Sequence, residues 1–209
     1  MQKTAEGKQE ECEQVENSQV ENSQVQNSQE MYNPDEERVY QLLAEMEIPY
    51  QIKHHPPVFT TEEAKALRTD FPGMKMKNLF VKDRANNTYY LVVLRENRRL
   101  DFNELRRLTG GKKACFTSPE ELMHFLGLIP GAVTPFGLIH ENAGQVILVL
   151  DYDIACADSG QTINFHPCVN TATLALSVGD FKKVIARFGN PVVEEAFCGQ
   201  LDKQSQPQG

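Results

Sequence analysis

The chain has 209 residues, of which 24% are charged and 40% hydrophobic, and its formal net charge is -8. These proportions are typical of one folded domain with tails and exclude a disordered chain. The acidic balance argues against a general nucleic-acid-coating protein, so we expect no DNA partner. No apolar run approaches the ~18 residues of a membrane span, and the first residues lack the apolar core of a secretory signal. We therefore expect a cytoplasmic protein without a membrane partner.

Cysteine spacing argues against two structural classes. The five cysteines are an odd number, lie far apart and include no CxxC pair: Cys12, Cys115, Cys156, Cys168 and Cys198. This pattern fits neither a disulfide framework nor a zinc ribbon. The chain also lacks GxGxxG and GxxxxGK[ST], the loops that hold dinucleotides and nucleotide phosphates. We expect no metal and no cofactor.

A five-residue repeat marks the N-terminal segment. Val15-Glu16-Asn17-Ser18-Gln19 recurs at 20–24 and, with one change, at 25–29, without an aromatic residue. Residues 1–33 also hold seven glutamates and two lysines. Such a segment cannot bury a face, so we predict a disordered acidic tail over 1–32. The polar, Gln-rich stretch 199–209 predicts a second disordered tail, which leaves 33–198 as the folded domain.

The first half of that domain begins with a capped helix. Asn33 followed by proline predicts a helix start, and apolar residues at helical spacing extend the helix over 34–47. A short strand is expected at 50–54, and Thr60 with Glu63 forms a capping-box pattern that opens a second helix. Further strands are expected at 79–81 and 89–94, with Asn86-Asn87 in the turn between them.

Helices and strands alternate irregularly through the second half. We expect helices from Asp101 to Gly110, from Ser118 onward and over 181–188. Strands are expected at 146–150, 162–165 and 171–176. Hairpins interspersed with helices, without a βαβ repeat, indicate an α+β (mixed α/β) domain on a partly antiparallel sheet.

Three segments carry more Gly, Pro, His and Asn than packing requires. Lys77-Asn78 precedes a strand, a loop of small residues spans 130–137, and His166 lies in the segment 165–173. A loop of small residues lets backbone N–H groups approach a ligand. Each segment also has a plain interpretation: a solvated lysine, an ordinary connection and a turn histidine. His54-His55 is interpreted as shaping a turn.

Charge is concentrated in one further segment. Residues 75–113 contain eleven Lys and Arg against four acids, a net of +7 in an acidic chain. This indicates a local contact with a polyanion. A pair of solvated faces explains the same charges.

Five short segments occur in the order typical of one family. They are His55-Pro56-Pro57-Val58-Phe59-Thr60, Lys77-Asn78-Leu79-Phe80-Val81-Lys82-Asp83, Tyr89-Tyr90-Leu91-Val92-Val93, Pro130-Gly131-Ala132-Val133-Thr134-Pro135-Phe136-Gly137 and His166-Pro167-Cys168-Val169-Asn170-Thr171-Ala172-Thr173. With them the chain from about Val39 to Val192 resembles the YbaK/prolyl-tRNA-synthetase-associated domain family. It is most similar to the free-standing prolyl-tRNA editing proteins.

The resemblance implies a fold, an activity and partners. The expected fold is a mixed sheet curled toward a barrel, with helices around it. The expected activity is hydrolysis of the ester of mischarged Ala-tRNA(Pro), in trans and without a cofactor. A synthetase site shaped for proline cannot strongly reject alanine, because each missing methylene is worth only ~1–3 kcal/mol. The expected partners are tRNA(Pro) and prolyl-tRNA synthetase.

The resemblance also assigns roles to individual residues. Lys77, Asn78 and His166 match the family's functional positions. Lys77 suits a cation that holds the terminal phosphate or polarises the ester carbonyl, because a lysine stays protonated unless deeply buried. His166 is expected to orient the substrate or a water, while the tRNA's own 2'-hydroxyl assists water activation. The pocket loop comprises Gly131, Ala132, Val133, Thr134, Pro135, Phe136 and Gly137, whose N–H groups around Gly131 would serve the oxyanion.

The basic segment then acquires a candidate role at the acceptor stem, with Arg98, Arg99, Arg106 and Arg107 as its probes. Two alternatives stay open. One keeps the fold and changes the substrate to Cys-tRNA(Pro) or another small amino acid. The other is a non-catalytic protein that binds tRNA or a synthetase as an accessory or regulator.

Overall fold

The computed structural model describes residues 33–57, 71–112, 114–194 and 200–201. Its helices are α2 (Pro34–Glu45), α4 (Phe102–Thr109), α5 (Pro119–Leu126), α6 (Tyr152–Ala155) and α7 (Val178–Phe188), with the 3-10 helices η2 (Pro135–Ile139) and η3 (Ala143–Gln145). Its strands are β1 (Gln51–His54), β2 (Met76–Asp83), β3 (Thr88–Arg95), β4 (Arg98–Arg99), β5 (Ala114–Phe116), β6 (Ile147–Leu150), β7 (Thr162–Phe165), β8 (Ala172–Ser177), β9 (Val192–Val193) and β10 (Gln200–Leu201).

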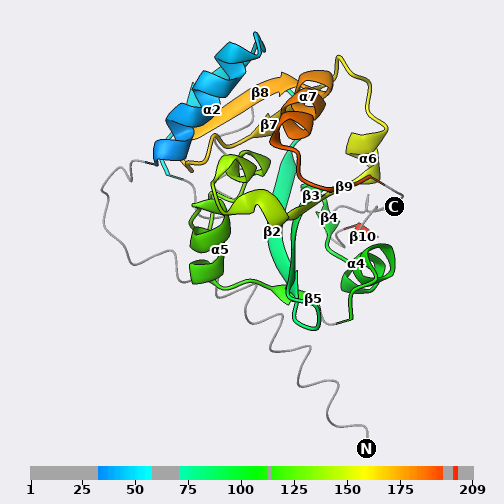
Figure 1. The fold of residues 1–209 in the computed structure, drawn as a ribbon. Coiled ribbons are helices and arrows are strands. Elements are labelled where there is room, and N and C mark those ends of the chain that lie inside the picture. The colour runs from blue at the N-terminus through cyan, green and yellow to red at the C-terminus, as the bar shows by residue number, and fades with distance from the viewer. Residues whose placement is uncertain (1–32, 58–70, 113, 195–199, 202–209) are drawn as a thin grey trace, which may run out of the picture.

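Two sheets meet at the start of β2. The larger has the order β5-β2-β3-β6-β9; its first three strands are antiparallel, and β3, β6 and β9 are parallel. The smaller, β1-β8-β7, is antiparallel throughout. A parallel bridge between Met74 and Ile163 joins them, so the strands turn from one sheet into the other (Figure 1). This confirms the predicted curled, partly antiparallel mixed sheet with helices around it.

Two apolar clusters fill the space between sheet and helices. The larger holds Leu43 of α2, Phe136 of η2 and Phe181 of α7 against the inner faces of β2, β3, β7 and β8. The smaller packs Leu105 of α4 against Val92 and its neighbours on the other face of β2 and β3. None of the helices described here is both long and apolar enough to cross a membrane.

Local sequence signals account for most helix ends. The Asn33 side chain accepts a hydrogen bond from the Asp35 N–H at 2.9 Å, and Ser118 forms a full capping box with Glu121. Pro34 and Pro119 follow these caps in the first turn, where proline's missing N–H costs nothing. α5 ends at Gly127, which has a φ of +62° that favours glycine. The predicted starts of α2 and α5 are confirmed.

Several elements differ from the sequence-based expectation. η2 takes up the last three residues of the expected loop 130–137 and continues to Ile139, because Thr134 caps it and Pro135 starts it. The short elements β4, β5, α6 and β9 were not predicted, since two to four residues carry no readable periodicity. The helix expected to open at Thr60 lies outside the described residues. Within the expected tail 199–209, Gln200–Leu201 forms β10 antiparallel to β4.

Candidate active site

His166 follows directly on the end of β7 and is 8% exposed. Its Nδ1 lies 2.7 Å from the carbonyl oxygen of Ala172. A carbonyl only accepts, so Nδ1 carries the proton of this hydrogen bond. In the neutral ring, Nε2 is then the nitrogen with a lone pair in the ring plane. The hydrogen bond to the first residue of β8 thus fixes both the orientation and the tautomer of the predicted histidine.

His55, which the sequence analysis interpreted as shaping a turn, lies against His166. The two rings are 5.9 Å apart between centroids, with an interplanar angle of 64°. The backbone N–H of His55 donates to Thr171 at 2.8 Å, and its Nε2 lies 2.9 Å from the Thr173 hydroxyl. Pairing of β1 with β8 therefore brings the two histidines together across more than a hundred residues. Only the family-like segment at 55–60 signalled this position.

Lys77 and His166 lie on two segments that a parallel bridge joins. The bridge pairs Met74 with Ile163, and each of the two residues lies three positions further along its own segment. On β2, Met76 and Phe80 face the larger core, so Lys77 faces the opposite side of that strand. The bridge thus makes neighbours of the segments that carry the predicted lysine and histidine.

Asn78, in contrast, projects to the other face of β2, because successive side chains of a strand alternate. There its Nδ2 donates to the carbonyl oxygen of Val133 at 2.9 Å. Its Oδ1 is buried and has no hydrogen-bond partner among the described residues. The structure thus places the predicted Lys77-Asn78 pair on opposite faces of β2. Asn78 contacts the pocket loop through Val133, and Lys77 points away from that face.

The predicted pocket loop divides into a buried and an accessible part. Gly131 is exposed, with a φ of +88° that favours glycine, and Val133 is half-buried. The other five residues are buried: Ala132, Thr134, Pro135, Phe136 and Gly137. The N–H groups of Ala132 and Gly137 already donate to the carbonyls of Ile129 and Thr134. Gly131 and Val133 are therefore the parts of the loop best placed to meet a ligand.

Cys168 lies two residues beyond His166 but is unsuited to nucleophilic chemistry. It is 2% exposed, and burial raises the pKa of its thiol well above the ordinary value. Its φ of +64° is rare for a residue other than glycine and marks the tight turn of the β7–β8 connection. Across the described ranges, no three His, Cys, Asp or Glu side chains stand together as a metal site requires.

The four candidate arginines fall into two kinds. Arg98 contacts the carboxylates of Asp151, at 3.3 Å, and Asp153, at 2.8 Å. Arg106 donates to the carbonyl of Phe102 at 3.1 Å and to the side chain of Asn103, within its own helix. Arg99 and Arg107 are exposed.

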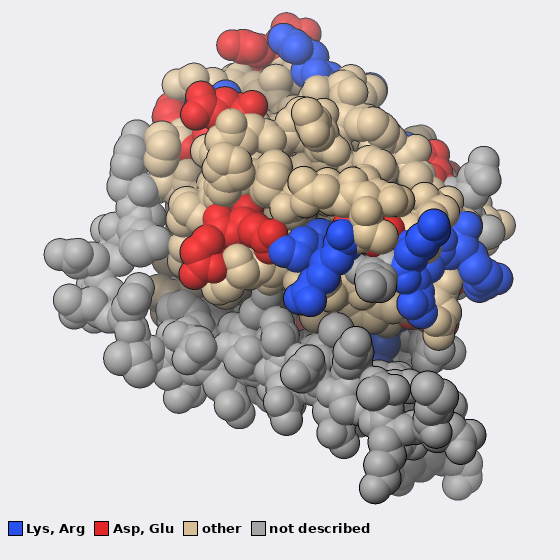
Figure 2. Space-filling model, turned by 60° about the horizontal axis from the view of Figure 1, so that its bottom comes forward, with Lys and Arg blue, Asp and Glu red and all other residues tan. Residues whose placement is uncertain are grey.

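Basic side chains gather along one band at the end of the molecule where α4 and β5 lie (Figure 2). An acidic patch borders one side of this band. Separate groups of basic side chains thus lie along one face of an acidic chain, which favours contact with a polyanion there.

Comparisons with known proteins identify the family of the chain. The sequence profile described as "Aminoacyl-tRNA editing domain" matches residues 55–184. The chain is 32% identical over 155 residues to the prolyl-tRNA editing protein ProX of Acetoanaerobium sticklandii, covering 74% of this chain and 93% of the relative. It is 32% identical over 157 residues to prolyl-tRNA synthetase associated domain-containing protein 1 of Bos taurus, covering 73% and 90%.

A crystal structure described as that of a proposed trans-editing enzyme for prolyl-tRNA synthetase shares the fold. Its TM-score is 0.58 at 22% identity, over 82% of this chain and 99% of the other. The matched profile begins at His55 and includes every residue of the site described above. The chain therefore belongs to the aminoacyl-tRNA editing domain family.

Proposed function

We propose that this protein hydrolyses mischarged Ala-tRNA(Pro) in trans. Membership of the editing family makes the chain an aminoacyl-tRNA deacylase, and the amino acid and the tRNA are what we propose. One observation carries the proposal. The segments that carry Lys77 and His166, both within the matched profile, are joined by the parallel bridge between Met74 and Ile163. A relative that is 32% identical over 155 residues is named for prolyl-tRNA editing.

The proposed chemistry is hydrolysis of the ester between alanine and the terminal ribose. A water oxygen bonds to the ester carbonyl carbon, the bond to the ribose oxygen breaks, and a proton ends on that oxygen. Negative charge develops on the carbonyl oxygen, where the Lys77 ammonium and the N–H groups of Gly131 and Val133 supply stabilisation. His166 accepts through Nε2 from the water or from the substrate's ammonium, since its Nδ1 is held by Ala172.

Selection of alanine would come from the size of the pocket beside Val133. Asn78 holds the Val133 carbonyl, so this loop is fixed in place before the substrate arrives. A site that admits a methyl side chain and excludes the proline ring removes the synthetase's error while sparing its correct product. Arg99 and Arg107 are the exposed cations that would contact the acceptor stem.

The test is the rate of hydrolysis of purified Ala-tRNA(Pro), Pro-tRNA(Pro) and Cys-tRNA(Pro) by the full chain and by Lys77→Ala. We expect the wild-type chain to hydrolyse Ala-tRNA(Pro) and neither of the other two substrates. The rate should be at least about 100-fold lower in Lys77→Ala, because the variant lacks the cation that stabilises the developing negative charge. Lys75→Ala is the matched control, as it removes a half-buried lysine two residues away. It should retain most of the activity.

The outcomes separate the alternatives. Hydrolysis of Cys-tRNA(Pro) at the same rate as Ala-tRNA(Pro) would favour the alternative in which Cys-tRNA(Pro) is a substrate. No hydrolysis by a folded chain that still binds tRNA would favour a non-catalytic accessory. A lower melting temperature in Lys77→Ala, with activity retained at low temperature, would make the lysine structural.

A further inference from the structure

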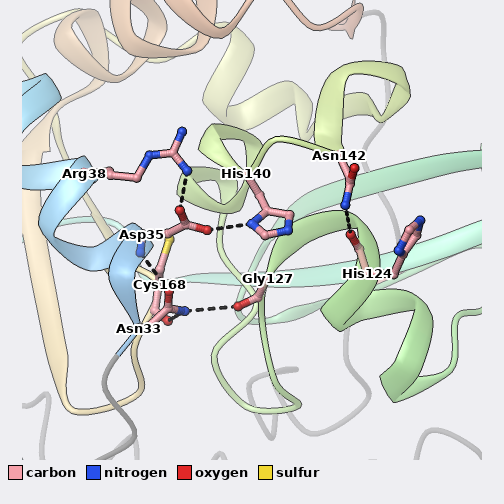
Figure 3. A network of polar contacts seen from close by, with 8 residues as sticks. All are labelled: Asn33, Asp35, Arg38, His124, Gly127, His140, Asn142 and Cys168. Carbon is pink, nitrogen blue, oxygen red and sulfur yellow. Dashed lines mark hydrogen bonds and ion pairs between the residues drawn. The ribbon is translucent and has the colours of Figure 1, made fainter.

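One side chain at the start of α2 contacts both the segment that leads into the pocket loop and the loop that carries His166. Nδ2 of Asn33 donates to the carbonyl oxygen of Gly127 at 3.1 Å and to that of Cys168 at 3.0 Å (Figure 3). Oδ1 of the same amide accepts from the Asp35 N–H and caps the helix. Asn33 thus uses both hydrogens and its oxygen, and its amide orientation is unambiguous because both partners of Nδ2 are carbonyls.

A second contact of this turn reaches the far end of the pocket loop. Asp35, which is 3% exposed, accepts from Nδ1 of His140 at 2.8 Å and from Arg38 at 2.6 Å. His140 ends η2, and its own N–H donates to Gly137 at 3.1 Å. In Figure 3 the Asp35 carboxylate lies between the arginine and the histidine.

The three anchor points bracket the site. Gly127 lies four residues before Gly131, His140 three after Gly137, and Cys168 two after His166. The contact at Gly127 is also sterically tight, since an added Cβ would lie 2.7 Å from Nδ1 of His140 and 3.0 Å from the Asp35 carboxylate. The distance between the pocket loop and the histidine loop is therefore set where α2 begins.

We propose that Asn33 is a positioning residue for deacylation: its amide holds the pocket loop and the His166 loop at a fixed separation. The inference rests on the proposed function, because it concerns the same site. Gly127, which leads into the pocket loop, and Cys168 of the His166 loop each present a carbonyl to this one amide, so loss of Nδ2 releases both segments at once. Small displacements of reacting groups lower rates steeply, and a shift of about 1 Å can cost on the order of 100-fold.

The test is Asn33→Ser in the full chain. Serine is as good a helix cap as asparagine, so it keeps the bond to the Asp35 N–H and removes only the two donors. The control is Asn142→Ser, because Asn142 also donates its amide to a carbonyl, that of His124 at 3.0 Å, at a distance from the His166 loop. For both variants we measure the melting temperature and the kcat and KM for Ala-tRNA(Pro). We also measure the ratio of the rates at which Ala-tRNA(Pro) and the same tRNA charged with serine are hydrolysed.

We expect Asn33→Ser to melt near the wild-type temperature. Its kcat should fall by about 10-fold or more with little change in KM, and it should discriminate less between tRNA charged with alanine and tRNA charged with serine. Amide hydrogen exchange should quicken at 128–133 and at 167–171 together. Asn142→Ser should change none of these. Unchanged kcat and unchanged exchange in Asn33→Ser would overturn the proposal, as would equal losses in both variants.

The exchange measurement keeps this inference separate from the proposed function. If the wild-type chain hydrolyses no aminoacyl-tRNA, the proposed function fails, and faster exchange in both loops of Asn33→Ser still supports the linkage through Asn33. If the wild type is active and Asn33→Ser behaves like it, only the positioning role fails.

Discussion

At the scale of single residues, hydrogen-bond partners decide which groups are available for chemistry. His166 donates Nδ1–H to Ala172, and His55 is held by Thr171 and Thr173. The chemistry of the histidines therefore depends on the start of β8, where the Ala172 carbonyl and the Thr173 hydroxyl hold the two rings. Asn78 is similarly committed to Val133, which makes it a support for the pocket loop.

Cys168 provides a prediction at this scale. Because burial raises the pKa of the thiol, a thiolate is not populated near neutral pH and cannot attack an ester. We expect Cys168→Ala to keep its rate of deacylation within about threefold of wild type, with a loss of about 1–2 kcal/mol in the free energy of unfolding from the small cavity. Single-turnover deacylation and urea unfolding measure the two effects. A folded variant with no activity would assign the thiol a catalytic role.

At the scale of elements, α5 is joined to β2 by one carboxylate. Glu121 completes the capping box of α5, and it also accepts from Lys82 of β2 and from the Tyr89 hydroxyl at 3.1 Å. Burial on its own raises the pKa of Glu121, but hydrogen bonds from Lys82, the Ser118 N–H and Tyr89 outweigh it and hold the pKa below its ordinary value. A single residue thereby caps a helix and attaches it to the sheet.

This carboxylate predicts how stability depends on pH. A folded-state pKa below the unfolded value of about 4.3 contributes stability that is present above that value and is lost as pH falls through the folded pKa. We expect Glu121→Gln to lower the melting temperature at pH 7, and we expect its difference from wild type to shrink as the pH falls and the Glu121 carboxyl becomes protonated. Thermal unfolding of both chains from pH 7 down to pH 3 measures this difference. If the difference in melting temperature between the two chains stayed constant across that range, the charge of Glu121 would make no contribution to stability.

At the scale of the whole molecule, charge is unevenly distributed. An acidic chain carries a basic band at the end where α4 and β5 lie (Figure 2). Within the basic segment, Arg98 is held by two aspartates, and burial raises the pKa of one of them, Asp151. Arg107 is exposed on α4. The two arginines should therefore respond differently to removal.

We expect Arg107→Ala to weaken tRNA binding and to reduce the slope of log affinity against log salt by about 1, as loss of one phosphate contact does. The melting temperature should not change. Arg98→Ala should lower the free energy of unfolding by about 1–3 kcal/mol, because Asp151 keeps a buried charge without its cation. Salt titrations of binding and denaturant unfolding distinguish the two effects. A reversal of these two phenotypes would refute the assignment.

The sequence by itself determined the local features of this protein. Caps at Asn33 and Ser118, the turn at Asn86-Asn87 and the long apolar strands were readable, because capping and periodicity depend only on near neighbours. Ordered family-like segments indicated Lys77, the pocket loop and His166 as candidates. Short elements such as β5 and β9 were not readable, because partners distant in the sequence create them.

Only the tertiary structure decided how the candidates relate in space. The parallel bridge at Met74 brings the segments of Lys77 and His166 together, and strand alternation places Asn78 on the face of β2 opposite Lys77. The pairing of β1 with β8 brings His55 to His166, and the fold commits Arg98 to two aspartates. These outcomes depend on register and on which strands become neighbours, and both are set by packing across the whole chain.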